Sequence, residues 1–239
     1  GGLRMQMVLE GQLLPVEAHP LDRAGAEPVF APTTARTAWL PDLDAVPESA
    51  WRRCQLLYLC SPGNRTGAAM DLAFFRRVLD LADRHDFVVA SDECYSELYA
   101  DEAAPPPSLL SAARAAGRSR FERCVVFHSL SKRSSVPGLR SGFVAGDADF
   151  LKRYRLYRTY HGSAMSLPVQ QASIAAWGDE AHVRANRRLY AEKYRAVLPL
   201  IGPPLATAMP EGGFYLWMRT PADDAAFARE LLRQYNVRV

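Results

Sequence analysis

Residues 124–143 have the sequence CVVFHSLSKRSSVPGLRSGF, in which an apolar run leads into a serine-rich loop that carries Lys132. The chain has only three lysines, Lys132, Lys152 and Lys193, among its 29 basic residues. An amine can lose its proton and form a Schiff base, whereas a guanidinium cannot. An isolated lysine on a turn is usually a surface residue. The position of Lys132, directly after a predicted strand, nevertheless indicates amine chemistry when its neighbours are considered.

The composition is that of a soluble globular protein. The 239 residues are 49% hydrophobic and 23% charged, which is enough for a substantial core in one large α/β domain or one and a half ordinary ones. The net charge of +3 is small and interspersed, so nothing indicates a nucleic-acid or membrane partner. The four cysteines lack metal-ligand spacing, and the sequence has no secretion pattern or membrane-spanning run. We expect reduced thiols in a cytoplasmic protein without a metal site.

Short apolar runs alternate with helical patterns through the middle of the chain. Such alternation predicts an α/β fold with a mostly parallel sheet flanked by helices. The predicted strands are 56–60, 87–90, 124–127 and 142–145, and the predicted helices between them are 71–82 and 109–116. Helical patterns then dominate at 150–160, 169–177, 180–200 and 225–235, with one more predicted strand at Phe214–Met218.

These patterns divide the chain into three parts. Residues 1–24 form a poorly defined segment with frequent glycine, proline and alanine. Residues 25–170 contain the predicted parallel sheet and form a large domain. Residues 171–239, with a long helix followed by a strand and a helix, are expected to form part of a smaller α+β domain.

Chemically versatile side chains follow three of the predicted strands. Asn64 lies in a turn after the first, Asp92 ends the second, and Lys132 follows the third. Ligands of parallel sheets bind where the carboxyl ends of the strands meet the loops. We therefore expect these three side chains to converge on one site.

Taken together, the candidates supply what a pyridoxal 5′-phosphate site requires. The cofactor aldehyde needs an amine, and its pyridine nitrogen needs a carboxylate that keeps it protonated. Donors near the ring oxygen tune the ring electronically, and a hydroxyl with an arginine can hold the phosphate. In that order, the candidates are Lys132, Asp92, Tyr95 with Asn64, and Ser129 with Arg140.

Three ordered segments carry a family resemblance. They are SPGNRTG at 61–67, DECYSELY at 92–99 and SLSKRSSVPGLRSGF at 129–143. Together they resemble the fold-type I, class I/II aminotransferases, which depend on pyridoxal phosphate. The residues around Lys132 and the segment 157–166 are most similar to the bacterial N-succinyldiaminopimelate aminotransferases. The resemblance extends from about Gly25 to the end of the chain.

The resemblance implies a role for each candidate and a reaction. Lys132 would be the Schiff-base lysine and Asp92 the partner of the pyridine nitrogen. Tyr95 and Asn64 would contact the ring oxygen, and Ser129 and Arg140 would hold the phosphate. The implied reaction is ping-pong transamination of N-succinyl-diaminopimelate with glutamate and 2-oxoglutarate, in lysine biosynthesis. A cytoplasmic homodimer acting on small amino acids and 2-oxo acids is also implied.

The sequence departs from the family at several places. Arg65 stands where the family usually has proline, which puts in question the turn that aims Asn64, since a nearby cis bond is costly without proline. Family chains are longer, and no glycine/serine phosphate loop or ring-stacking aromatic precedes residue 25. Val8–Gly11 resembles the helix after that loop. The arginine that grips the substrate carboxylate is not found before Val239. We therefore expect a chain truncated at both ends.

Other hypotheses remain open. The same chemistry suits aspartate, alanine, aromatic or LL-diaminopimelate aminotransferases, and it also suits a C–S lyase that carries out β-elimination. A different possibility is a truncated, non-catalytic fragment, because deleting strands from a parallel sheet exposes apolar edges and can remove part of the folding core.

Overall fold

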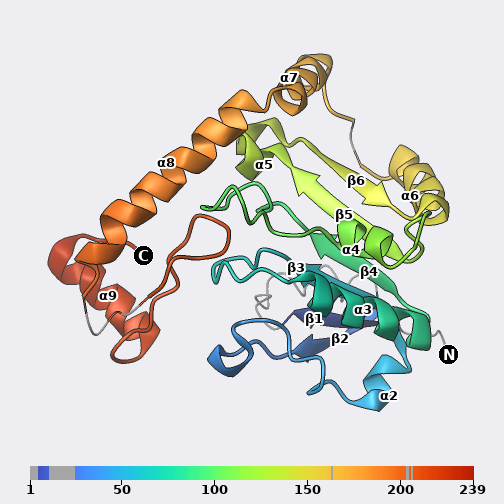
Figure 1. Cartoon of the computed structure of the whole chain (residues 1–239), viewed down its shortest axis with the longest axis horizontal. Coiled ribbons are helices and arrows are strands. Elements are labelled where there is room, and N and C mark those ends of the chain that lie inside the picture. Colours follow the sequence, from blue (N-terminus) through green and yellow to red (C-terminus); the bar gives the residue numbers. More distant parts are fainter. Residues whose placement is uncertain (1–4, 11–24, 163, 203–204, 206) are drawn as a thin grey trace.

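A six-stranded sheet forms the centre of the protein. The structure is a computed structural model that describes residues 5–10, 25–162, 164–202, 205 and 207–239. Five strands are parallel and the last is antiparallel to its neighbour (Figure 1). The strands are β1 (Met5–Glu10), β2 (Ala26–Ala31), β3 (Cys54–Cys60), β4 (Val88–Asp92), β5 (Cys124–Ser129) and β6 (Gly142–Gly146).

The strand order in the sheet is β2-β1-β3-β4-β5-β6. Cys60 at the end of β3 pairs with Asp92 of β4, and Asp92 pairs with Phe127 of β5. This register brings the carboxyl ends of three adjacent strands to one edge, as the sequence predicted. The mostly parallel sheet confirms the α/β class. Five short helices and 3-10 turns connect the strands: η1 (Ala35–Thr37), α2 (Glu48–Trp51), α4 (Leu109–Ala115), α5 (Leu130–Arg133) and η2 (Pro137–Leu139).

The longest crossover helix is α3 (Leu72–His85), and its sequence explains both its ends and its buried face. Asp71 caps the first turn by accepting a hydrogen bond from Phe74 N at 2.7 Å. Phe75, Val78, Leu79 and Ala82 recur at helical spacing and are buried. The helix contacts β4 and α4, and α4 contacts β5. One face of the sheet is therefore covered by a continuous apolar core.

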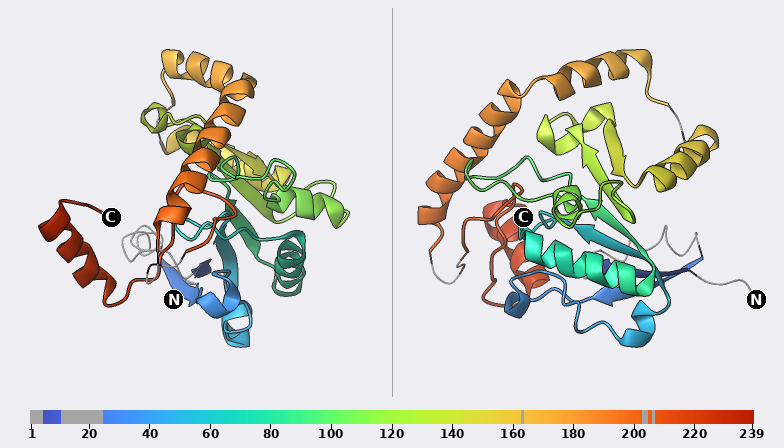
Figure 2. Two further views of the ribbon diagram at one scale, coloured as in Figure 1. Left: turned by 60° about the vertical axis from the view of Figure 1, so that its left-hand side comes forward. Right: turned by 45° about the vertical axis from the view of Figure 1, so that its right-hand side comes forward.

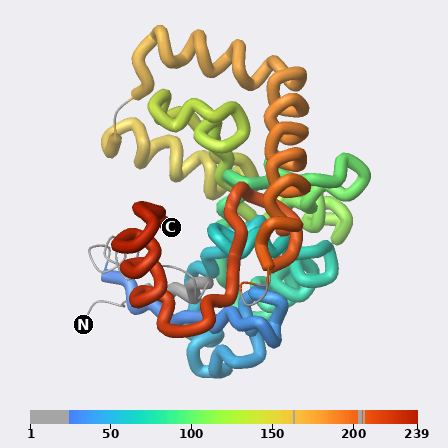
Figure 3. The backbone as a smooth tube through the Cα atoms, turned by 90° about the vertical axis from the view of Figure 1, so that its left-hand side faces the viewer, coloured from blue at the N-terminus to red at the C-terminus, as the bar shows by residue number. Residues whose placement is uncertain are grey.

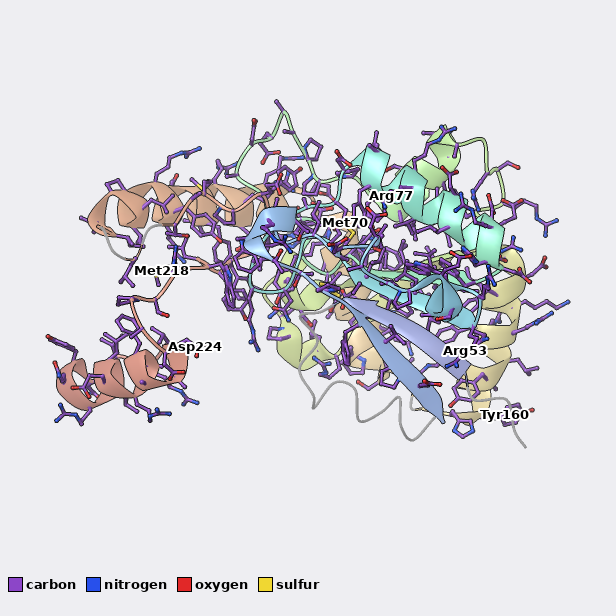
Figure 4. The ribbon with its side chains drawn as sticks, turned by 90° about the horizontal axis from the view of Figure 1, so that it is seen from below. Arg53, Met70, Arg77, Tyr160, Met218 and Asp224 are labelled. Carbon is purple, nitrogen blue, oxygen red and sulfur yellow. The ribbon has the colours of Figure 1, made fainter. Side chains whose placement is uncertain are left out.

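The second half of the chain is mostly helical. It follows β6, the strand at one edge of the sheet. Figure 2 shows two of its helices, α7 and α8, meeting at a bend, and Figure 3 shows the chain returning after α8 before its last helix. In Figure 4, Met218 and Asp224 mark the segment that leads from the loop after α8 to that last helix. The elements are α6 (Ala148–Tyr160), α7 (Leu167–Gly178), α8 (Ala181–Val197), η3 (Leu198–Leu200) and α9 (Asp224–Tyr235).

One predicted element was wrong. Phe214–Met218 is not a strand, and within the described residues no strand of the sheet lies beside it. Tyr194 donates to the carbonyl of Gly213, and Thr207 donates to that of Trp217. The segment Val8–Gly11, which resembles a family helix in sequence, belongs up to Glu10 to the strand β1, which pairs with two parallel strands; Gly11 lies outside the described residues.

Within the described residues, no helix combines the length and the apolar character needed to cross a bilayer. The predicted domain division at residues 25–170 and 171–239 stays a prediction.

Candidate active site

The loops that follow β3, β4 and β5 meet at the carboxyl edge of the sheet, and Asp92 lies at their centre. Its Oδ1 accepts a hydrogen bond from Cys94 N at 3.0 Å, and its Oδ2 accepts one from the Tyr58 hydroxyl at 3.1 Å. Burial, reinforced by the negative charge of Asp92, raises the pKa of Tyr58. Tyr58 therefore stays a hydrogen-bond donor that orients the carboxylate.

The turn after β3 positions Asn64. Gly63 N donates to the carbonyl of Ala68 at 2.8 Å, and Gly67 N donates to that of Gly63 at 3.0 Å, which closes the turn. The Tyr95 hydroxyl then donates to Asn64 Oδ1 at 3.2 Å. Tyr95 and Asn64 thus lie together, as expected for two residues that contact the same part of the cofactor.

Arg65 does not remove this turn. The cis bond of the segment is Ser61–Pro62, which has its proline. Arg65 itself is exposed, with a φ of 85°. A non-glycine residue in the left-handed region is uncommon, and Arg65 adopts it where the chain turns back toward Gly67.

Lys132 lies in the single turn of α5, directly after β5. Ser129 begins this turn by accepting a hydrogen bond from Ser131 N at 3.0 Å. The Lys132 Nζ lies 4.6 Å from the ring centre of Phe214 and 5.7 Å from that of Tyr95. Among the described residues its amine has no hydrogen bond or ion pair. The amine is therefore held by aromatic faces and is available for bonding.

Cys94 is half-buried and follows Asp92 by two residues. Burial raises the pKa of its thiol and the Asp92 carboxylate raises it further, whereas the Lys132 ammonium opposes them. The ring of Tyr95, three residues after Asp92, lies 5.7 Å from the Lys132 Nζ, which places Lys132 and Asp92 in the same site.

The predicted phosphate clamp is only partly assembled. Ser129 Oγ lies 3.2 Å from the carbonyl oxygen of Ser141, so Ser129 is next to the segment that carries Arg140. The Arg140 guanidinium, however, is exposed and donates to the carbonyl of Pro137 at 2.9 Å, within its own turn. The structure brings five of the six predicted residues into adjoining loops, but it does not bring the Arg140 guanidinium to Ser129.

A segment from the second half of the chain completes the site. Gly212 N donates to the carbonyl of Gly67 at 2.9 Å, and Gly213 N donates to that of Leu98 at 2.7 Å. A Cβ on Gly67 would lie 2.4 Å from the Gly212 oxygen, so only glycine permits this approach. The contact places Phe214 over Lys132, with its ring 5.5 Å from that of Tyr95.

Sequence reasoning missed Tyr58 and Phe214. Tyr58 is the one aromatic residue in an otherwise aliphatic run, which could have suggested a polar partner beside the strand. Phe214 follows two glycines, a signal for close approach of the backbone to another segment.

The donor set fits pyridoxal phosphate. An unpaired amine lies in the same site as an oriented carboxylate, and the ring of Tyr95, whose hydroxyl binds Asn64, lies near that amine. Such groups can bind an aldehyde covalently, hold a protonated ring nitrogen and donate to a ring oxygen.

Comparison with known proteins gives the same assignment. The model of "Aminotransferase class I and II" matches residues 20–239. This family depends on pyridoxal phosphate, so the predicted cofactor is confirmed. An LL-diaminopimelate aminotransferase of Nitratidesulfovibrio vulgaris is 32% identical over 218 residues, which are 90% of this chain and 55% of the relative.

Two solved structures extend the comparison. An aminotransferase from Neisseria meningitidis is 46% identical with a TM-score of 0.92, covering 100% of this chain and 60% of its own. A probable N-succinyldiaminopimelate aminotransferase from Thermus thermophilus is 27% identical with a TM-score of 0.87, covering 97% of this chain and 61% of its own. The chain thus spans about half the length of the curated relatives it matches.

Proposed function

Because this chain belongs to the class I and II aminotransferases, we propose that its protein transfers an amino group from an amino acid to a 2-oxo acid. The observation that carries this proposal is the unpaired amine of Lys132, held over Phe214 in the same site as the oriented Asp92 carboxylate.

Each residue has a distinct part in holding the cofactor. The Lys132 amine would bond to its aldehyde, and Asp92 would hold the proton of its ring nitrogen with Tyr58 keeping the carboxylate in place. Tyr95 and Asn64 would contact its ring oxygen. The guanidinium of Arg140 would have to turn away from Pro137 to join Ser129 at the phosphate. When bound, the cofactor supplies an electron sink for the charge that develops at the substrate α-carbon.

Lys132 would also move the proton that transamination requires. Once free, its Nζ would be the base that takes the proton from the substrate α-carbon and the acid that gives it back. The rings of Phe214 and Tyr95 flank the amine and keep water from this side of it.

For the substrate, we propose N-succinyl-diaminopimelate, with glutamate and 2-oxoglutarate as the second pair. The residues around Lys132 and the likeness to the Thermus thermophilus protein support this choice. LL-diaminopimelate is the second candidate, because several curated relatives carry that name. Either substrate would place the protein in lysine biosynthesis.

We further propose that the protein forms homodimers. Large apolar side chains on α6 and α7, at Leu156, Tyr160, Leu167 and Ile174, have between 63% and 79% of their surface exposed. Exposed apolar groups in this number favour a protein partner, and a second copy is the one the family implies. Sedimentation would distinguish dimer from monomer.

Cofactor binding is tested by trapping. The protein is incubated with pyridoxal phosphate, reduced with borohydride, digested and mapped by mass spectrometry. We expect the pyridoxyl label on Lys132, its loss in Lys132→Ala, and its retention in the matched variant Lys152→Ala. Label distributed evenly over the three lysines would contradict the assignment.

The substrate is tested by single turnovers. Protein loaded with cofactor is mixed with N-succinyl-diaminopimelate, LL-diaminopimelate or glutamate, and the 2-oxo acid released is measured. We expect the succinylated substrate to react fastest, and faster reaction of LL-diaminopimelate would favour the second candidate. Specific label on Lys132 without any 2-oxo acid would leave the chain as a cofactor-binding, non-catalytic one.

A further inference from the structure

The three residues that follow Lys132 all contact the bend between α7 and α8, here called the elbow (residues 176–186). Arg133 binds the carbonyl of Ala176 and the carboxylate of Glu180. Ser134 Oγ lies 2.8 Å from His182 Nε2, and Ser135 Oγ lies 3.5 Å from Asn186 Oδ1. Each of the three residues after the reactive amine therefore contacts the elbow.

Arg133 makes the strongest of these contacts. Its side chain is buried, and its guanidinium donates to the carbonyl of Ala176 at 2.8 Å. The same group lies 5.0 Å from the ring centre of Trp177. A guanidinium can donate in two directions and stack at once, so it fixes both the position and the plane of the contact. A carbonyl near the end of α7 also favours a cation through the helix dipole.

The elbow also reaches the strand that carries Asp92. The ring of Trp177 lies 4.8 Å from that of Phe143, which lies 4.9 Å from the ring of His128. His128 Nε2 is 3.3 Å from the carboxylate of Glu93, the residue after Asp92. The elbow thus contacts the Lys132 loop directly, and a row of rings connects it to the Asp92 loop.

We propose that Arg133 is a positioning residue. Its contacts with the elbow hold the turn that carries Lys132 and thereby fix the position of the Lys132 amine. Arg133 and Lys132 are neighbours in one helical turn, so their side chains diverge by about 100°. Anchoring one side chain to the elbow therefore directs the other toward Phe214. The inference rests on the proposed function only in treating Lys132 as the reactive amine.

The three lysines of the chain allow a direct measurement. Lys152 and Lys193 are exposed, whereas Lys132 is half-buried beneath aromatic rings. Reductive methylation with formaldehyde, followed by mass spectrometry, gives the rate for Lys132 relative to both exposed lysines in one sample. This ratio needs no cofactor. It reports the surroundings of the amine and not the activity of a loaded enzyme.

The variants separate positioning from stability. Arg133→Met removes the anchor, Arg133→Lys keeps its charge with a single-point donor, and Glu180→Gln weakens one contact. The matched control is Arg118→Met, because the Arg118 side chain is also mostly buried and binds Asp83 and the carbonyl of Leu79, on α3. Thermal midpoints of all variants, without cofactor, measure their loss of stability.

We expect Arg133→Met to raise the relative rate of Lys132 about tenfold, the factor for losing one charge-assisted hydrogen bond. Arg133→Lys and Glu180→Gln should give smaller increases, and Arg118→Met should give none at a similar loss of thermal midpoint. An unchanged rate in folded Arg133→Met would overturn the proposal, as would an equal increase in Arg118→Met. If Arg133→Met does not fold, unchanged rates in the two milder variants overturn it.

The same variants are then loaded with pyridoxal phosphate and reduced. We expect the fraction of label on Lys132 to fall in Arg133→Met and to recover partly in Arg133→Lys. Absence of label in the unaltered protein would mean that the proposed cofactor role of Lys132 fails. The methylation ratios would still decide whether Arg133 positions the amine.

Discussion

The sheet and the C-terminal arm (residues 148–239) are stabilised in different ways. The sheet packs against α3 and α4 through fully buried side chains such as Leu57 and Phe75. In the arm, α6 and α9 contain no buried residue within the described part of the chain. Elsewhere in the arm, α8 buries Val183, Ala191 and Tyr194, and polar contacts through Arg133, Arg187 and the glycines near Phe214 also attach the arm.

The residues that contribute most to folding are therefore largely different from those that surround the reactive amine. Hydrophobic burial is the largest favourable contribution to folding, so the sheet should determine whether the chain folds. Asp92 and Asn64 belong to loops of that sheet. The surroundings of Lys132, in contrast, include Phe214 from the arm. A change in the arm should therefore alter the amine more than it alters the melting of the protein.

The largest effect is expected in the core, for Phe75→Ala. Phe75 is completely buried between α3 and the sheet. Its removal deletes apolar contacts and leaves a cavity, which should lower the free energy of unfolding by about 4 kcal/mol. Urea denaturation followed by circular dichroism measures this loss.

Leu232→Ala in α9 is the matched control, because half of its side-chain surface is exposed. The expected loss is below about 0.5 kcal/mol. Similar losses in the two variants would show that the arm and the sheet are stabilised alike, and would remove the basis of the comparison.

A smaller effect is expected where the arm meets the loop after β4. Arg187 of α8 is buried and binds both carboxylate oxygens of Glu102 at 2.8 and 2.9 Å, and Glu97 at 2.8 Å. Its guanidinium also lies 4.4 Å from the Tyr99 ring centre. Arg187→Met should lower the free energy of unfolding by about 2 kcal/mol, less than for a fully buried pair because both carboxylates are partly solvated.

Hydrogen exchange would locate the effect of Arg187→Met. We expect faster exchange in residues 93–104 and little change in β3 to β5. Arg233→Met is the control, since Arg233 pairs with Glu230 on the exposed face of α9 and its loss should leave stability almost unchanged. Uniformly faster exchange across the sheet would mean that Arg187 supports the whole fold and not one loop.

Local sequence patterns predicted the parts of the site that belong to the sheet. One apolar run ends in Asp92, and two others are followed by Asn64 and Lys132, so all three residues are expected at strand ends. Parallel strands bring those ends together. This inference needs only the order of elements along the chain. The residue types then indicated the cofactor, and the sequence resemblance added the family.

Contacts between distant segments could not be predicted in this way. Phe214 reaches Lys132 because Gly67 and Gly212 allow two backbones to touch, which no local pattern encodes. Arg133 belongs to a charged, serine-rich stretch that favours exposure, yet it is buried against the elbow. The strand prediction for Phe214–Met218 was wrong for the same reason, since an apolar run becomes a strand only beside another strand.

The smallest effect concerns Asp147, which joins the sheet to the arm. Its carboxylate caps α6 by accepting hydrogen bonds from Asp149 N at 2.9 Å and Phe150 N at 3.1 Å, and it accepts another from Arg123 N at 2.8 Å. Partial burial alone would raise the pKa of Asp147, but these three backbone donors lower it below its ordinary value. The charged form is therefore favoured by folding.

A lowered folded-state pKa contributes stability above the unfolded value, near 3.9, and loses it as the pH falls through the folded value. Asp147→Asn should cost about 0.5–1 kcal/mol at neutral pH, and the difference from the unaltered protein should be smaller at pH 3, which lies below the unfolded value. Urea midpoints at both pH values measure this. Asp147→Ala is the control, because it also loses the capping acceptor and should stay less stable at both pH values. If the deficit of Asp147→Asn were the same at both pH values, the cap would act through shape alone, and the charge at this junction would contribute nothing to holding the arm on the sheet.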